Sequence, residues 1–238
     1  MQQNILNPGR RRDMTIQNYF SRIYAYMGGG LLLSAIMAWL TVRPPMIHWF
    51  YKIQDGVIAS YSIWGWIAIF APLLVVFLIG HAANKLNVAM AQFWFWVFSA
   101  LMGVSLSNIL LAFNMNAVSQ AFLCTAAMFF GLSLFGFKTE RDLTSIGRFA
   151  LIGLIGVVIV SVVNIFIGSG KVNFVLNILS VVIFTALTIY DTNKLKAVYQ
   201  ETDSEDVMKA KAIHGALALY LDFINLFRLM LYFLNSRR

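Results

Sequence analysis

The amino-acid sequence predicts an all-α membrane protein built as a bundle of seven transmembrane helices. Its 238 residues are 60% hydrophobic and only 12% charged, whereas soluble domains average about 45–50% apolar and about 25% charged residues. Seven apolar runs each approach the roughly 20 residues that a helix needs to cross a hydrocarbon core of about 30 Å. The runs are too long for transmembrane β-strands and do not alternate with a period of two. A soluble fold and a β-barrel are therefore both disfavoured.

Each expected span is an apolar run bounded by polar residues. The first, 24–42, is longer than the hydrophobic core of a signal peptide and no clear small-residue cleavage site follows it, so we interpret it as a retained helix. The third and fourth runs are separated only by residues 114–116. We expect an N-terminal tail over 1–23, a transmembrane domain over 24–234 and a short C-terminal tail over 235–238. The seven expected spans are 24–42, 57–80, 88–113, 117–137, 146–168, 174–196 and 212–234.

The basic residues divide unevenly between the two sides of this arrangement. One side carries twelve: Arg10, Arg11, Arg12, Arg22, Lys85, Lys138, Arg141, Arg148, Lys194, Lys196, Lys209 and Lys211. The other carries five: Arg43, Lys52, Lys171, Arg237 and Arg238. The positive-inside rule then places the N-terminus in the cytoplasm and the C-terminus outside. The net charge of +8 is explained by the orientation in the membrane and by attraction to anionic lipid. A nucleic-acid partner would need a basic patch on a soluble domain, and none is predicted, so we expect the lipid bilayer and no nucleic acid as a partner.

Two acidic residues fall inside the expected spans, Asp191 and Asp222. An ionised Asp at a helix centre costs at least about 2.5–3.5 kcal/mol, so such residues usually face a bundle interior and mark a functional site. Simpler interpretations stay open for both. Asp191 has Lys194 three residues on and could form an interfacial ion pair. Asp222, with Asn225 on the same helix face, could be a structural hydrogen-bonding residue.

Three segments resemble one family of membrane proteins. They read "FGFKTERDL" (135–143), "IYDTNKLK" (189–196) and "GALALYLDFINLFRLMLYF" (215–233). These segments and the seven spans are similar to the Bax inhibitor-1 family, also called the transmembrane Bax inhibitor motif family, and in particular to its bacterial members. The resemblance covers essentially the whole chain. It implies a seven-helix bundle with a central seventh helix, located in the bacterial inner membrane and acting as a pH-sensitive calcium leak channel.

The resemblance also implies roles for particular residues. The family's hydrogen-bonded Asp pair, near the cytoplasmic end of the pore, corresponds to Asp191 and Asp222. A basic latch at the end of the second helix corresponds to Lys85. From their own positions, each three residues after one Asp, Lys194 and Asn225 are expected to support the pair. Counted from the cytoplasmic ends of the expected spans, Asp191 lies about 8 Å deep and Asp222 about 15 Å deep, so their contact requires tilt, a helix break or different helix bounds.

Physical chemistry agrees with such a gate. Two carboxylates close together in low dielectric cannot both ionise cheaply, so the pair titrates as a unit. A shared proton can close a gap between helices, and its loss can open the gap by repulsion. The exposed oxygens of Asp191 and Asp222 would then bind calcium transiently, because calcium prefers six to eight oxygen ligands and two Asp residues cannot form a tight site. Calcium and protons are the expected permeant and regulatory ions.

Two other functions are compatible with the sequence. An intramembrane aspartyl protease also uses paired Asp residues. The second Asp here, however, follows "LYL" (219–221) and lacks the Gly-x-Gly-Asp motif of those proteases. Their Pro-Ala-Leu segment is also missing, and all four prolines of this chain precede the Asp pair. We therefore expect no enzymatic activity. A non-transporting regulatory protein could instead bind a membrane protease or stress factor through its N-terminal tail. The three histidines have no metal-ligand spacing, and we expect no cofactor.

Overall fold

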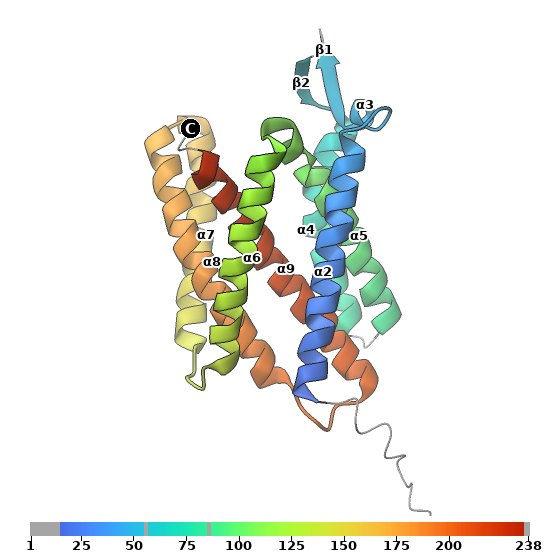
Figure 1. The fold of residues 1–238 in the computed structure, drawn as a ribbon, viewed down its shortest axis with the longest axis vertical. Helices are drawn as coiled ribbons and strands as arrows, with labels where there is room; N and C mark the ends of the chain where they lie inside the picture. The colour runs from blue at the N-terminus through green and yellow to red at the C-terminus, as the bar shows by residue number, and fades with distance from the viewer. Residues whose placement is uncertain (1–14, 55–56, 85–86, 236–238) are drawn as a thin grey trace, which may run out of the picture. The chain divides into compact units, whose positions relative to one another are not determined.

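The computed structural model describes residues 15–54, 57–84 and 87–235 (Figure 1). Within these residues seven helices are long and apolar enough to cross a membrane, which confirms the predicted fold class. These helices are α2 (Ile16–Thr41), α4 (Ile63–Asn84), α5 (Val88–Ala112), α6 (Met115–Lys138), α7 (Thr144–Ile167), α8 (Gly170–Val198) and α9 (Glu205–Asn235).

Several helices extend beyond the apolar runs that predicted them. Helix α2 begins at Ile16, inside the expected tail, because the Thr15 hydroxyl accepts a hydrogen bond from the Asn18 amide and caps the helix at 3.3 Å. Helix α9 begins at Glu205 rather than residue 212, and its first turn carries two acids, which the positive end of a helix dipole favours. A helix can continue into the polar interface, so hydropathy marks only its apolar part. The rest of the expected tails, residues 1–14 and 236–238, lies outside the described residues.

The division between the third and fourth spans is confirmed at Asn114. Its side-chain oxygen accepts a hydrogen bond from the Ala117 amide at 2.8 Å and caps the start of α6. An Asn at this position satisfies a backbone N–H that the helix itself leaves unpaired. The polar break that looked weakest in the sequence is therefore a helix boundary with its own cap.

The expected second span, 57–80, is wrong at its N-terminal end. Residues Val57–Tyr61 form strand β2, which pairs antiparallel with β1 (Tyr51–Gln54) after the short helix α3 (Ile47–Phe50). Val, Ile and Tyr favour strands, and helix α4 starts only at Ile63, where the Ser62 hydroxyl accepts a hydrogen bond from the Gly65 amide at 3.1 Å.

Tyr51 fixes this hairpin to helix α5. Its side chain is only 4% exposed, and its hydroxyl lies 2.7 Å from that of Ser107. Burial raises the pKa of Tyr51, so the neutral phenol is the form that bonds to Ser107.

The chain forms two compact units. The first comprises Met1–Ala112 with Tyr199–Leu217, and the second comprises Phe113–Val198 with Ala218–Arg238. In the first, α5 packs against both α2 and α4, and Ser34 of α2 donates to the Ser99 carbonyl of α5 at 2.6 Å. In the second, α8 packs against both α6 and α7. Helix α9 contributes its beginning to the first unit and its remainder to the second.

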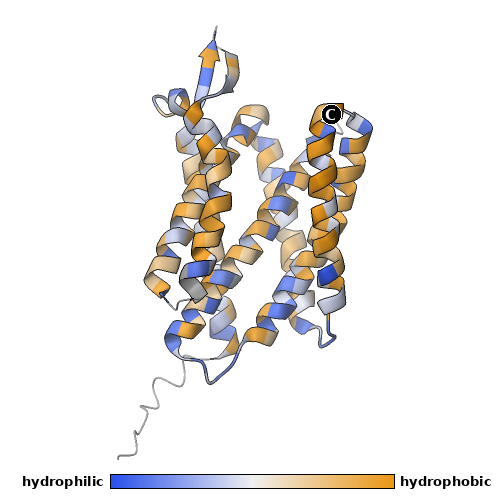
Figure 2. Cartoon of the chain, turned by 180° about the vertical axis from the view of Figure 1, so that it is seen from behind, coloured by the Kyte–Doolittle hydropathy of each residue, from blue (hydrophilic) through white to orange (hydrophobic). Residues whose placement is uncertain are grey.

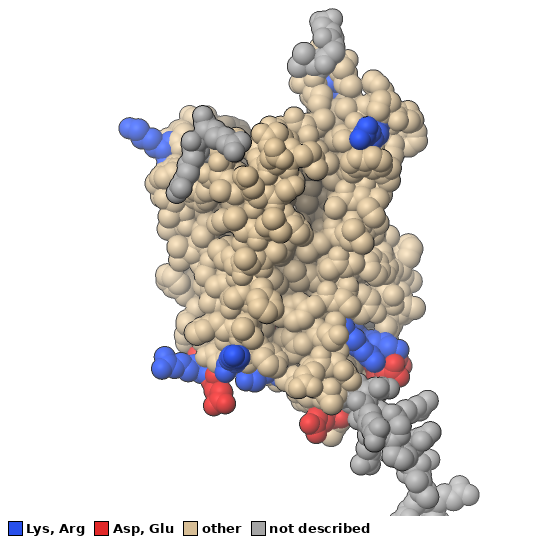
Figure 3. Space-filling view, viewed as in Figure 1, with Lys and Arg blue, Asp and Glu red and all other residues tan. Residues whose placement is uncertain are grey.

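Surface chemistry follows the length of the helices. Hydrophobic residues cover their middle turns (Figure 2), and on the face seen in Figure 3 charged side chains gather near the helix ends with an uncharged surface between. In the most apolar window of α7 only 6% of residues are buried, against 56% in α9. Among the seven spans α7 is the least buried and α9 the most buried, in agreement with the enclosed seventh helix that the family resemblance implies.

Candidate functional site

The two Asp residues within the spans meet in the second unit. Asp191 lies near the end of α8 and Asp222 lies in α9. The Asp222 side chain is 4% exposed and Asp191 is half-buried. Their carboxyl groups are in side-chain hydrogen-bond contact.

This contact has a definite proton requirement. An ionised carboxylate has only acceptors, whereas a protonated one also has an O–H donor. Two carboxyl groups therefore form a hydrogen bond only when a proton lies between them. The Asp222 Oδ2 atom is buried and receives no N–H or O–H donor from the described residues.

The contact between Asp191 and Asp222 has to be reconciled with their unequal positions along the two helices. Asp191 lies seven residues before the end of α8 at Val198, and Asp222 lies seventeen after the start of α9 at Glu205. At 1.5 Å per residue these intervals are about 10 Å and about 25 Å. Helices that bring such unequal positions together must be inclined to each other, because parallel helices counted from the same side would place the two acids at different depths. Helix bounds and tilt together permit the contact.

The residues predicted to support the pair lie in different environments. Lys194 acts electrostatically on Asp191, and its ammonium also lies 5.8 Å from the centroid of the Tyr190 ring. Asn225 donates its side-chain N–H to the Leu221 carbonyl of its own helix at 2.8 Å, which leaves its Oδ1 as an acceptor. Lys85, the predicted latch, lies outside the described residues.

Polar contacts that the sequence did not reveal fasten α8 to α6 beside Asp191. The hydroxyls of Thr192 and Ser133 lie 3.1 Å apart. The Asn193 amide donates to the carbonyls of Gly136 at 3.4 Å and Thr139 at 3.2 Å. Partners more than fifty residues apart cannot be paired from one sequence, although small polar residues within an apolar run indicate close helix packing.

Two glycines permit the close approach of these helices. A Cβ at Gly136 would overlap the Ile189 carbonyl oxygen, and one at Gly147 of α7 would lie 2.5 Å from ring carbons of Tyr190. The residues just before Asp191 are therefore enclosed by α6 at Gly136 on one side and by α7 at Gly147 on the other. This packing fixes the direction in which α8 presents its carboxyl group.

Packing on the α9 side is aromatic. Phe223, next to Asp222, makes edge-to-face contacts with Phe122 and Phe129 of α6, each at 5.5 Å between ring centroids. Such pairs add about 0.5–1.5 kcal/mol beyond area burial. The two helices that carry the acids are thus held to α6 by different kinds of contact.

Asn193→Ala is expected to destabilise the protein by about 1 kcal/mol, because it removes both hydrogen bonds to the end of α6. The matched control is Asn177→Ala in the same helix. The Asn177 amide is exposed and donates to Asn173 of its own helix at 2.9 Å, so its loss should have a smaller effect. Thermal unfolding of both variants in detergent measures the difference. Equal melting temperatures for the two variants would contradict the assigned role of Asn193.

The site has few ligands for a resident metal ion. Among the described residues no group of three or more His, Cys, Asp or Glu side chains is arranged to hold one. Calcium prefers six to eight oxygens, and a pair of carboxyl groups supplies fewer.

Fold and site together define a helical multi-pass membrane protein with two acidic side chains in contact between its last two spans. A family model described as "Inhibitor of apoptosis-promoting Bax1" matches residues 16–238. The chain therefore belongs to the Bax inhibitor-1 family.

Curated relatives agree with this assignment over nearly their full length. The inner membrane protein YbhL of Escherichia coli is 33% identical over 94% of this chain and 93% of its own. An uncharacterized membrane protein of Streptococcus pyogenes is 38% identical over 90% of this chain and 91% of its own. The uncharacterized protein RP147 of Rickettsia prowazekii is 35% identical over 95% of this chain and 92% of its own. The names of the Escherichia coli and Streptococcus pyogenes relatives describe membrane proteins, and none of the three names states an enzymatic activity.

Proposed function

We propose that this protein is a pH-sensitive calcium leak channel of the inner membrane, gated by Asp191 and Asp222. The observation that carries the proposal is the contact of two acidic side chains on different helices, one of them buried within a membrane span. Such an arrangement responds to protonation, because two carboxyl groups in contact cannot both ionise cheaply. Its membership of the Bax inhibitor-1 family supports the same function by resemblance.

Gating follows from the proton shared by the pair. With the proton present, the carboxyl groups attract each other and close the gap between α8 and α9. With both groups ionised, charges about 4 Å apart would repel by about 4 kcal/mol at an effective dielectric constant of about 20. A bias of this size changes the ratio of two conformations by about a thousandfold. Alkaline conditions therefore favour the open form and acidic conditions the closed form.

Calcium passage uses the oxygens that gating exposes. Ionised Asp191 and Asp222 attract the cation, and Asn225 Oδ1, backbone carbonyls and water complete its coordination. Weak, incomplete coordination suits transport, because an ion must leave a site as readily as it enters. The flux is expected to be slow and to run down the calcium gradient.

Calcium influx into dye-loaded proteoliposomes, measured across pH, tests this function directly. The wild-type chain should give flux that rises with pH and exceeds that of empty vesicles at the same pH. Vesicles indistinguishable from empty ones at every pH would refute a calcium leak and favour a non-transporting regulatory role.

Basic side chains near the gate can be compared in the same assay. Lys85→Ala should raise the leak if Lys85 is the latch to Asp191, while Lys194→Ala should raise it if the local charge matters more. Lys171→Ala, at the opposite end of α8, is the matched control for loss of a positive charge. If neither Lys85→Ala nor Lys194→Ala alters the leak relative to this control, no basic latch operates.

The proposed orientation places the N-terminus in the cytoplasm and the C-terminus outside, because twelve basic residues flank one side of the spans and five the other. Fusions at each terminus to a reporter active only in the cytoplasm should therefore give signal at the N-terminus alone. Signal from a C-terminal fusion would contradict the orientation.

A further inference from the structure

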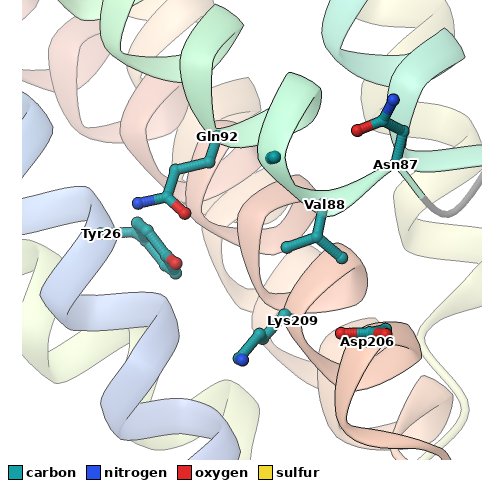
Figure 4. Close-up of a pocket in the computed structure, with 7 residues that line it drawn as sticks. Tyr26, Asn87, Val88, Gln92, Asp206 and Lys209 are labelled. Atoms are coloured by element: carbon teal, nitrogen blue, oxygen red, sulfur yellow. The ribbon is translucent and has the colours of Figure 1, made fainter.

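An open polar cavity of about 660 Å³ lies in the first unit, whereas the carboxyl pair belongs to the second unit. Its wall includes Tyr26 of α2, Asn87, Val88 and Gln92 at the start of α5, and Asp206 and Lys209 at the start of α9 (Figure 4). This volume is in the range of small-molecule sites, about 300–1,000 Å³.

The charges in the cavity restrict the kind of ligand that fits. Asp206 and Lys209 lie three residues apart on one helix, so they occupy neighbouring surface positions. A simple anion would be attracted by Lys209 but repelled by Asp206. A simple cation would be attracted by Asp206 but repelled by Lys209. A ligand carrying both a phosphate and an ammonium group satisfies both side chains. Lys209 suits the phosphate, to which lysine ammonium groups bind as point charges.

Lys209 is available for such a ligand because its present partner holds it weakly. Its ammonium lies 2.8 Å from Glu205, but the two side chains are 37% and 57% exposed. Exposed ion pairs of this kind contribute only about 0.2–1 kcal/mol. A phosphate that approaches from the cavity can therefore replace Glu205.

The uncharged part of the wall is fixed and offers donors. The Tyr26 ring packs against Phe95 and Trp96, with centroids 6.0 and 6.2 Å away. The Asn87 Oδ1 atom accepts from the Met90 amide at 3.0 Å, which leaves its side-chain N–H groups as donors. The Gln92 amide extends into the same space between α2 and α9 (Figure 4).

The position of the cavity favours a lipid over a soluble ligand. It lies at helix ends, where the charged residues of this unit begin, and a phospholipid places its head group at this depth. The same first turns of α5 also expose apolar side chains, with Met90 46% and Phe93 56% exposed. Acyl chains can pack on this surface while the head group occupies the cavity.

We propose that this cavity binds the head group of a glycerophospholipid with a primary ammonium, with phosphate on Lys209 and ammonium on Asp206. The quaternary ammonium of a choline lipid has no N–H to donate to Asp206. A phosphatidylglycerol head group has no cation for Asp206. Selectivity for phosphatidylethanolamine is therefore the expected property of the site, and it is independent of calcium transport.

Native mass spectrometry of the full chain in detergent tests the proposal with dioleoyl phosphatidylethanolamine, phosphatidylcholine and phosphatidylglycerol, and with soluble glycerophosphoethanolamine. The wild-type chain should retain phosphatidylethanolamine preferentially. Lys209→Gln and Asp206→Asn should each bind it up to about fivefold more weakly, the change expected for the loss of an exposed ion pair worth up to about 1 kcal/mol.

Matched variants separate this site from general charge effects. Glu205→Gln removes the competing partner of Lys209 and should bind phosphatidylethanolamine at least as well as the wild type. Lys209→Arg keeps the charge and should retain binding, even if Lys209→Gln failed to fold. Equal binding of all three lipids, equal losses in Glu205→Gln and Lys209→Gln, or binding of the soluble ligand alone would overturn the proposal.

Discussion

Asp222→Asn and Asp191→Asn are each expected to abolish most of the pH dependence of calcium flux. In either variant only one carboxyl group remains, so deprotonation no longer produces repulsion of about 4 kcal/mol between two charges about 4 Å apart. The new amide N–H can also donate to the remaining carboxylate, which keeps the contact without a proton. Flux in proteoliposomes, measured at a series of pH values, should therefore vary far less than in the wild type.

Asp142→Asn supplies the control for this experiment. Asp142 precedes α7 in the same unit, and its carboxylate accepts a hydrogen bond from the Thr144 amide at 2.8 Å. Hydrogen bonds from Thr144 hold the pKa of this exposed carboxyl below its usual value. The variant loses an acid outside the membrane spans, so its flux should follow the wild-type pH profile. If both Asp191→Asn and Asp222→Asn also kept that profile, the pair would not be the gate, and a non-transporting regulatory role would become the better proposal.

Gly136→Ala should give the largest loss of stability among single-methyl additions near the site. Its new Cβ would overlap the Ile189 carbonyl oxygen, and neighbouring Thr192 leaves little room to shift. Overpacking of this kind costs about 1–3 kcal/mol. A melting temperature several degrees below that of the wild type is expected in detergent, since each kcal/mol corresponds to about 2–4 °C for a chain of this length.

Gly131→Ala in the same helix isolates the steric effect. A Cβ at Gly131 has no neighbouring atom within 4 Å, and alanine has a higher helix propensity than glycine. This variant should match or exceed the wild type in melting temperature. Equal destabilisation by both substitutions would show that the helix backbone, rather than contact with α8, sets the need for glycine.

The sequence predicted those features that depend on composition within one segment. Apolar runs predicted seven spans, and the scarcity of acids in them singled out Asp191 and Asp222. Hydropathy failed at residues 57–61, because the apolar residues of a strand read like the start of a helix. It also missed the first turns of α2 and α9, since polar residues can belong to a helix that leaves the bilayer.

Contacts between distant segments could not be predicted in the same way. Ser133 and Gly136 matter because α8 lies beside them in the fold. Their local sequence carries no information that Thr192 and Asn193 are their partners. The depths of Asp191 and Asp222 seemed inconsistent because helices were counted as parallel. Inclination between helices arises from packing over many residues, so one sequence does not specify it.

The unequal fastening of the two acid-bearing helices has a mechanical consequence. Beside Asp191, α8 is tied to α6 by directional hydrogen bonds through Thr192 and Asn193. Beside Asp222, α9 contacts α6 through aromatic rings at Phe223, and a shift of these apolar contacts leaves no buried polar group without a partner. When the carboxyl groups repel, we expect α8 to stay in place on α6 while α9 moves. Distance probes between α6 and α9 should then report a change that probes between α6 and α8 do not.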